Sequence, residues 1–186
     1  MGKGESGQMS VLRRMFQKII NSYRRRDPIQ YARYIGVKVG NNCRFVDNPS
    51  WGTEPYLISI GNHVLISSQV TFVNHDGSTF VFRETEPYKG TYKFGPIKIG
   101  DNCFIGLRSI LLPNVSVGSD CIIAAGSVVT KSVPSGEVWG GVPARYIMKT
   151  EDYAKKCYEN RLPYDAERIV SNKKEEMLRC IRMDGE

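Results

Sequence analysis

The residues with the clearest chemical capacity in this sequence are its two histidines, His63 and His75. Imidazole gains and loses a proton near neutral pH, which suits it to take a proton from a reacting hydroxyl group. His63 belongs to the segment Gly61-Asn62-His63, and we interpret it as a solvated turn residue. His75 lies at the start of a long irregular segment and is followed by Asp76-Gly77, so we predict that it is a general base. Two histidines are too few for a three-histidine zinc site in one chain, so we predict no metal site.

A six-residue repeat predicts the fold that must position His75. Large apolar residues recur every six positions from 99 to 129, and a second residue, usually smaller, stands two positions before each. A period of six matches neither a helix nor a half-buried strand, and it is typical of a hexapeptide-repeat parallel β-helix. We therefore predict a mainly β fold in which three hexads close one triangular coil. The large positions are Ile99, Ile105, Leu111, Val117, Ile123 and Val129, and the second positions are Ile97, Cys103, Ser109, Val115, Cys121 and Ser127.

The same spacing extends toward the N-terminus with two interruptions. Both interruptions fall between the third strand of one predicted coil and the first strand of the next, so both insertions must leave at the same corner. The second insertion, residues 74–95, is rich in polar and aromatic residues. We expect it either to contribute to a binding site or to form a surface flap without contacts. The predicted coils have their large residues at positions 39, 45 and 51; 60, 66 and 72; 99, 105 and 111; and 117, 123 and 129.

This corner brings three polar residues together. Glu54, His75 and Asn114 each stand three residues past the last large residue of successive coils. Adjacent coils are separated by about 4.8 Å, so we expect Glu54 to approach His75 and hydrogen-bond one ring nitrogen. The other nitrogen would then serve as the base. Asn114 either contributes to this site or serves only as a turn residue.

The segments on either side of the repeat predict helices. An apolar stripe predicts a helix from Ser10 to about Arg26, which ends at Asp27-Pro28. Two further helices are expected near 151–160 and 165–182, where they would cap the open end of the coils. The predicted divisions of the chain are an N-terminal helical segment over 1–34, the β-helix over 35–149 with its inserted loop 74–95, and a C-terminal helical extension over 150–186.

The net charge of +7 is concentrated at the N-terminus. Residues 1–34 hold eight Lys and Arg against two acidic residues, a balance of +6. This basic helix predicts either a solvated surface or a peripheral contact with an anionic membrane or polymer. Aromatic residues do not interleave with these charges, so we predict no nucleic-acid partner.

Cysteine usage and hydropathy bear on the compartment. Three of the five cysteines, Cys43, Cys103 and Cys121, occupy inward positions of the repeat, where we interpret them as core residues rather than disulfides or metal ligands. No apolar run approaches the roughly 20 residues of a membrane span, and the N-terminus lacks the apolar core of a signal peptide. We therefore predict a cytoplasmic protein.

Five segments spread over residues 35–149 carry a resemblance to a known family. They are Gly52-Thr53-Glu54-Pro55-Tyr56-Leu57-Ile58, Asn74-His75-Asp76-Gly77, Ile99-Gly100-Asp101-Asn102-Cys103-Phe104-Ile105-Gly106, Ala125-Gly126-Ser127-Val128-Val129-Thr130-Lys131, and Gly140-Gly141-Val142-Pro143-Ala144-Arg145. They resemble the left-handed β-helix acyltransferases, and more closely the maltose, galactoside and capsular-polysaccharide O-acetyltransferase branch. The resemblance implies left-handed coils, acetyl-CoA as co-substrate, and a homotrimer with its sites between adjacent prisms.

The resemblance also implies roles for individual residues. The family's histidine base corresponds to His75, with Glu54 as its predicted partner. Asn74 and Asp76, which flank His75, are candidates for acceptor binding together with Asn114. The family's contacts to CoA would fall on Leu107, Ala125, Thr130, Lys131 and Arg145. The two cations among these five residues suit a polyanionic cofactor.

These observations predict an acetyl-CoA-dependent O-acetyltransferase that acts on a sugar or polysaccharide hydroxyl. Transfer would be direct, without a covalent intermediate, with His75 as the general base. Two alternatives stay open at this point. The first is an N-acetyltransferase of an amino sugar or an antibiotic, and the second is a trimeric β-helix that binds a ligand without catalysis.

Overall fold

The computed structural model describes residues 15, 18–19, 21–22 and 26–183. Most of the helix predicted from Ser10 to Arg26 lies outside the described residues. Those between 15 and 22 that are described are helical. The first helix that the structure describes over its full length is α2 (Pro28–Tyr34).

Helix α2 corrects our interpretation of Asp27-Pro28 as a helix end only, because these residues also start a helix. The Asp27 carboxylate accepts hydrogen bonds from the backbone N–H groups of Ile29 and Gln30, both at 3.1 Å. Pro28 suits the first helical position, where its missing N–H costs nothing. Ala32 of α2 is fully buried and belongs to the same apolar core as the coils that follow.

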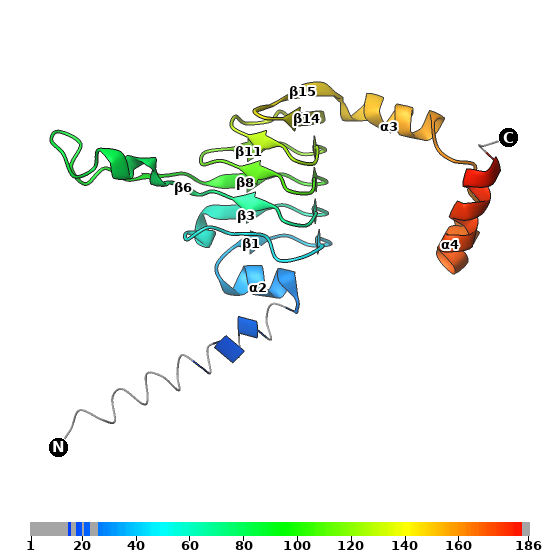
Figure 1. Cartoon of the computed structure of the whole chain (residues 1–186), viewed down its shortest axis with the longest axis horizontal. Helices are drawn as coiled ribbons and strands as arrows, with labels where there is room; N and C mark the ends of the chain where they lie inside the picture. Colours follow the sequence, from blue (N-terminus) through cyan, green and yellow to red (C-terminus); the bar gives the residue numbers. More distant parts are fainter. Residues whose placement is uncertain (1–14, 16–17, 20, 23–25, 184–186) are drawn as a thin grey trace, which may run out of the picture. The chain divides into compact units, whose positions relative to one another are not determined.

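Three columns of short parallel strands form the body of the molecule (Figure 1). The first column is β1 (Lys38–Val39), β3 (Ile58–Ile60), β8 (Ile97–Ile99) and β11 (Ser116–Val117). The second is β2 (Arg44–Phe45), β4 (Leu65–Ile66), β9 (Phe104–Ile105), β12 (Ile122–Ile123) and β14 (Glu137–Gly141), to which β15 (Ala144–Lys149) adds as an antiparallel end strand. The third is β5 (Thr71–Phe72), β10 (Ile110–Leu111) and β13 (Val128–Val129). Chain order visits the three columns in turn, which makes a parallel β-helix.

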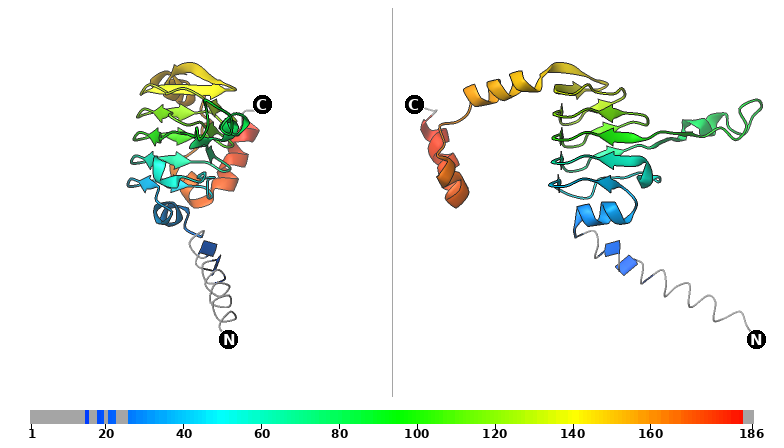
Figure 2. Two further views of the ribbon diagram at one scale, coloured as in Figure 1. Left: turned by 90° about the vertical axis from the view of Figure 1, so that its left-hand side faces the viewer. Right: turned by 180° about the vertical axis from the view of Figure 1, so that it is seen from behind.

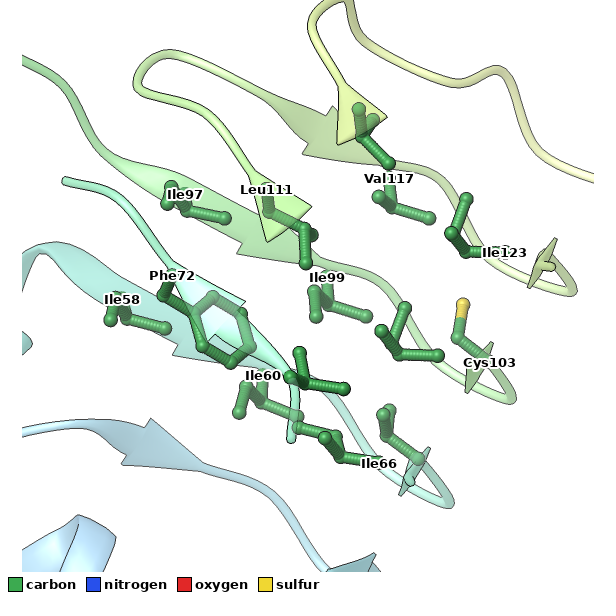
Figure 3. Packing of buried hydrophobic residues seen from close by; sticks show 14 of the residues in the cluster. Ile58, Ile60, Ile66, Phe72, Ile97, Ile99, Cys103, Leu111, Val117 and Ile123 are labelled. Atoms are coloured by element: carbon green, nitrogen blue, oxygen red, sulfur yellow. The ribbon is translucent and has the colours of Figure 1, made fainter. Parts of the chain in front are cut away.

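The strand register confirms the predicted grouping of the repeat into coils. Residue 60 pairs with 39 and 99, and 99 pairs with 117. Residues 45, 66, 105 and 123 pair in the same way in the second column, as do 72, 111 and 129 in the third. The large inward residues from 45 to 129 are at most 8% exposed, and they stack on their equivalents from coil to coil (Figure 3). Each such side chain contributes about 1.5–3 kcal/mol by burial, so the stack holds the coils together.

The corners between strands are tight turns, and one of them places His63. Asn42, His63, Asn102 and Asp120 occupy the same corner and have φ between 54° and 58°. His63 Nδ1 lies 2.8 Å from the Asn102 side-chain oxygen one coil away. His63 is therefore the exposed turn residue that the sequence predicts.

Both insertions leave the coils at one corner, as predicted. The first lies between Trp51 and β3 and contains the short 3-10 helix η1 (Pro55–Leu57). The second lies between β5 and β8 and forms an arm that projects from the coils (Figure 2). The base of the arm is an antiparallel pair of β6 (His75–Asp76) and β7 (Lys93–Phe94), and η2 (Gly77–Val81) follows β6. The arm is therefore ordered by a hairpin rather than being only a loop.

The end of the repeat is also more regular than predicted. Val133 bridges to Val117 and Trp139 pairs with Ile123, so the chain begins a fifth coil. Strand β14 then pairs antiparallel with β15, and residues 140–145 form the tip of this hairpin. Strand β15 thereby pairs with β14, the last parallel strand of the second column, which would otherwise be an unpaired edge.

The C-terminal residues form a second compact unit, which begins at residue 151. It contains helix α3 (Thr150–Glu159) except for its first residue, and α4 (Ala166–Met183), which has a non-helical residue at Asn172. Glu176 is buried there and accepts hydrogen bonds from the backbone of Asp165 and from Arg179, which lower the pKa of its carboxyl group to about 2. The predicted capping role of these helices stays a prediction. Among the described residues, none of the helices has the length and apolarity needed to span a bilayer.

Candidate active site

The centre of the candidate site is the contact between His75 and Glu54. His75 begins β6 at the base of the arm, and Glu54 lies just before η1 in the first insertion. His75 Nδ1 is 3.0 Å from Glu54 Oε2. The imidazole is 41% exposed and the carboxylate side chain 16%. The predicted approach of these two side chains is thus present, and their catalytic roles stay predictions.

This contact determines which nitrogen of neutral His75 carries the proton. An ionised carboxylate can only accept a hydrogen bond, so the nitrogen that faces Glu54 must be the donor. Nδ1 therefore carries the hydrogen, and Nε2 keeps its lone pair. A half-exposed imidazole in this form is able to take a proton from a group that approaches Nε2.

Thr53 is a member of this group that sequence reasoning missed. Its hydroxyl lies 2.7 Å from both Glu54 carboxylate oxygens and 3.0 Å from His75 Nδ1. Thr53 falls outside the six-residue repeat and stands in an insertion, so no periodic signal singles it out. The sequence offers two signals, the position of Thr53 directly before Glu54 and its place in a segment that resembles the family.

The Asn74 side chain packs between the two insertions, and its contact with an acceptor stays a prediction. The residue is fully buried, and its amide nitrogen donates to the Trp51 carbonyl oxygen at 2.9 Å. A Cβ atom on Gly52 would lie 2.4 Å from the Asn74 amide oxygen, and Gly52 has φ of +69°. Asn74 and Gly52 therefore pack the two insertions against each other, which positions Glu54 and His75.

Asp76 serves the arm in the described structure. Its Oδ1 accepts hydrogen bonds from the Ser78 backbone and hydroxyl at 3.0 and 2.6 Å, and its Oδ2 pairs with Lys93 Nζ at 3.0 Å. The Ser78 hydroxyl, followed by Lys93, lowers the pKa of the Asp76 carboxyl group to about 2. These contacts cap η2 and tie it to β7. A contact of Asp76 with an acceptor stays a prediction.

Asn114 takes the simpler of its two predicted roles. It is exposed, with φ of 65°, and stands at the turn that follows β10. A Cβ atom on Gly95, where the arm rejoins the coils, would lie 2.5 Å from the Asn114 backbone nitrogen. Asn114 thus forms the turn beside the arm, and its role in acceptor binding stays a prediction.

The five residues predicted to contact CoA are not gathered in one place. Leu107 and Ala125 are exposed at the corner between the second and third columns, where the Gly126 N–H donates to the Leu107 carbonyl oxygen at 2.7 Å. Thr130 and Lys131 are exposed after β13, at the corner of His75. Arg145 is exposed on β15. The two corners belong to different edges of the prism, so one chain alone does not assemble all five around His75.

Exposed aromatic rings adjoin His75 along the arm. Phe94 pairs with His75 across the β6–β7 hairpin, with 6.2 Å between the ring centroids. Tyr92 stacks on Phe94 at the same centroid distance, and the two residues are 60% and 50% exposed. These rings present apolar surface directly beside the candidate base. Within the described residues, no cluster of three or more His, Cys, Asp or Glu side chains is arranged to hold a metal ion.

Comparisons with known proteins identify the family. The family model described as the hexapeptide repeat of succinyl-transferase matches residues 96–131. Protein CapG of Staphylococcus aureus is 43% identical over 165 residues, which cover 85% of this chain and 93% of that protein. The galactoside O-acetyltransferase of Escherichia coli K12 is 31% identical over 151 residues, 80% of this chain and 71% of that protein.

A solved structure agrees with these similarities. The hexapeptide-repeat-containing acetyltransferase of Vibrio cholerae superposes with a TM-score of 0.54 at 26% identity. The match covers 62% of this chain and 63% of that one, just under two thirds. A β-helix that only binds a ligand is therefore not the favoured alternative. The parallel coils, the matched repeat and these relatives show that the chain is an acyltransferase that belongs to the hexapeptide-repeat acetyltransferase family.

Proposed function

We propose that the chain transfers an acetyl group from acetyl-CoA to a hydroxyl group of a sugar or polysaccharide. The observation that carries this proposal is the Glu54–His75 contact, which leaves Nε2 as a proton acceptor on a half-exposed ring. A hydroxyl group is a poor nucleophile until a base removes its proton. A histidine held in this tautomer supplies such a base near neutral pH.

The reaction follows from this geometry in two steps. His75 Nε2 takes the proton of the acceptor hydroxyl while its oxygen attacks the thioester carbonyl carbon, which forms a tetrahedral oxyanion. The carbon–sulfur bond then breaks, and the CoA thiolate takes the proton from Nε2. The acetyl ester and free CoA thiol are the products, and His75 returns to its starting form. Glu54 stabilises the transient imidazolium through Nδ1–H.

Two features support a sugar as the acceptor. One relative is named a galactoside O-acetyltransferase. Phe94 and Tyr92 also offer exposed ring faces beside His75, and the C–H face of a pyranose packs well on such a surface. A sugar seated on Phe94 would hold its hydroxyl groups within reach of the imidazole, since the two rings are 6.2 Å apart.

The separation of the predicted CoA contacts supports a homotrimer. Leu107 and Ala125 occupy one corner, whereas Thr130 and Lys131 share the corner of His75. A second prism placed against this corner would bring its Leu107 and Ala125 to the His75 of the first. The exposed Lys131 and Arg145 would then meet the phosphates of CoA. We place the enzyme in the cytoplasm, with its basic N-terminus as a candidate contact to an anionic membrane.

The test combines donor binding with product analysis. Purified enzyme is titrated calorimetrically with acetyl-CoA, and release of free thiol is then followed with matched galactosides and amino sugars. We expect acetyl-CoA to bind, thiol release to require the hydroxyl acceptor, and mass spectrometry to find a base-labile ester. Acetylation only of the amine would replace this proposal with N-acetyl transfer by the same base. Failure to bind acetyl-CoA would remove the proposed donor.

A further inference from the structure

We propose that Thr53 is a positioning residue, whose hydroxyl locks the Glu54 carboxylate and His75 Nδ1 into one hydrogen-bonded group. The inference rests on the proposed function of His75 as the base. Thr53 lies in a segment that resembles the family, but the six-residue repeat gives it no role. The inference follows from the hydroxyl's distances of 2.7 Å to both carboxylate oxygens and 3.0 Å to Nδ1.

Counting protons shows how the three groups must be connected. The carboxylate has none to give, and the hydroxyl has one. If that proton went to Nδ1, the carboxylate would lose its donors, and a bare Nδ1 lone pair would face Glu54 Oε2 at 3.0 Å. If the hydroxyl donates to Glu54, its own lone pairs face Nδ1, and every contact has one donor and one acceptor. Nδ1–H then lies between two acceptors, Glu54 Oε2 and Thr53 Oγ1.

Two acceptors constrain the imidazole more than one does. A single carboxylate oxygen would allow the ring to swing about the Nδ1–H bond, whereas a second acceptor at the same distance fixes its direction. The Thr53 hydroxyl also restrains the carboxylate itself, because it contacts both oxygens. Glu54 sets the tautomer, and Thr53 therefore governs where Nε2 points.

The backbone around Thr53 is held in place by the neighbouring coil. Trp51, two residues earlier, accepts a hydrogen bond from Asn74, which directly precedes His75. Gly52 packs against the amide of the same Asn74. Thr53 and His75 are thus joined through rigid flanking residues as well as through their side chains, which suits the hydroxyl to an aligning role.

The test compares two variants of Thr53. Thr53→Val keeps the shape of the side chain and removes the hydroxyl, and Thr53→Ser keeps the hydroxyl. We expect Thr53→Val to lower kcat by about 2- to 10-fold, the size of one net hydrogen bond, with KM for both substrates unchanged. Thr53→Ser should restore kcat. A merely structural role would lower stability in both variants without separating kcat from KM.

A nitrogen-15 NMR experiment on the imidazole rings provides a readout that does not need turnover. The chain has only two histidines, and His63, which contacts Asn102 at a different corner, serves as the internal reference. We expect His75 to carry its proton on Nδ1 in all three proteins, and the resonances of Nδ1 and its proton to shift in Thr53→Val, where one of the two acceptors is lost, but not in Thr53→Ser. An unchanged His75 spectrum in Thr53→Val would overturn the inference, whatever happens to kcat. If the proposed acetyl transfer is wrong, the thiol-release assay fails but the NMR result for His75 still stands. A wrong role for Thr53 and a wrong proposed function are therefore distinguishable.

Discussion

The regular coils and the corner that carries the two insertions use side chains in opposite ways. In the coils, inward residues such as Ile105, Leu111 and Ile123 are fully buried, and each strand pairs with its equivalents above and below. At the corner, Glu54 and His75 are partly exposed and hydrogen-bond one another. The coils therefore supply position, and the interruptions of the repeat supply the residues of the candidate site.

Two equivalent residues of one corner make the same point. Asn114 and His75 each stand three residues past the last large residue of a coil. Where the repeat is unbroken, Asn114 closes a tight turn with φ of 65°. Where the arm is inserted, His75 instead starts strand β6 and meets Glu54. An insertion converts a turn position into a site.

The largest expected effect is on turnover when the base is removed. We expect His75→Ala to lower the rate of acetyl transfer by about 10²–10⁴-fold, because a positioned general base contributes that much to such reactions. Acetyl-CoA affinity and the oligomeric state should be unchanged, as calorimetry and light scattering would measure. The matched control is His63→Asn, which suits its left-handed turn and should keep full activity. Full activity of His75→Ala would rule out this residue as the base.

The next prediction concerns the coils and stability rather than catalysis. Ile105 is fully buried, so Ile105→Ala should lower the free energy of unfolding by about 2–5 kcal/mol through lost burial and a residual cavity. Phe104, its neighbour on β9, is 39% exposed and provides the control. Phe104→Ala should lower the free energy of unfolding, measured by chemical denaturation, by clearly less than Ile105→Ala does. Equal losses for both variants would contradict the inward and outward alternation of the coil.

A smaller effect is expected from the aromatic surface of the arm. Phe94→Ala should raise KM for a pyranose acceptor about fivefold, because loss of about 40 Å² of apolar contact costs roughly 1 kcal/mol. Neither KM for acetyl-CoA nor the unfolding free energy should change much, since Phe94 is 50% exposed. Phe80→Ala, at an exposed position farther along the same arm, is the control. A change in KM for acetyl-CoA alone would assign Phe94 to the donor instead.

The smallest predicted effect is a loosening of the arm in acid. The Ser78 hydroxyl and Lys93 lower the pKa of Asp76 from its ordinary 3.8 to about 2. A carboxyl group with a lowered pKa in the folded state stabilises that state while it is ionised, so its contribution is complete above about pH 4. It should be lost as the pH falls toward 2. The protection factor of the Ser78 amide, which is its intrinsic exchange rate at a given pH divided by its observed rate, would measure this loss.

The control for this pH dependence is Asp76→Asn, which cannot ionise. In this variant the protection factor of the Ser78 amide should already be lower near neutral pH. It should not change further between pH 4 and 2. Amides inside the coils, such as that of Ile105, should keep their protection over the same range. A protection factor at the Ser78 amide that is the same at pH 6 and pH 2 would contradict the capping role of Asp76.

Periodicity explains why much of the fold follows from the sequence. The six-residue spacing identifies the inward residues, and counting in threes predicts that residue 60 pairs with 99, and 66 with 105, as observed. The approach of Glu54 to His75 follows from the same count, because both stand at the same offset in adjacent coils.

The remaining features depend on contacts that have no period. The burial of Asn74 results from its fit against Gly52, and the hairpin of the arm results from pairing across an 18-residue separation between His75 and Phe94. Thr53 acquires its place only once both insertions are folded. Helix α2 was missed because Asp27-Pro28 can both end one helix and start another.

The most direct test of the central claim is the position of a bound acceptor in a crystal structure with CoA and a sugar. The account predicts an acceptor hydroxyl oxygen about 2.6–3.2 Å from His75 Nε2, with the sulfur of CoA beside that hydroxyl and close enough to receive the proton from Nε2. A sugar bound away from the corner of Glu54 and His75, with its hydroxyl groups out of reach of Nε2, would contradict it.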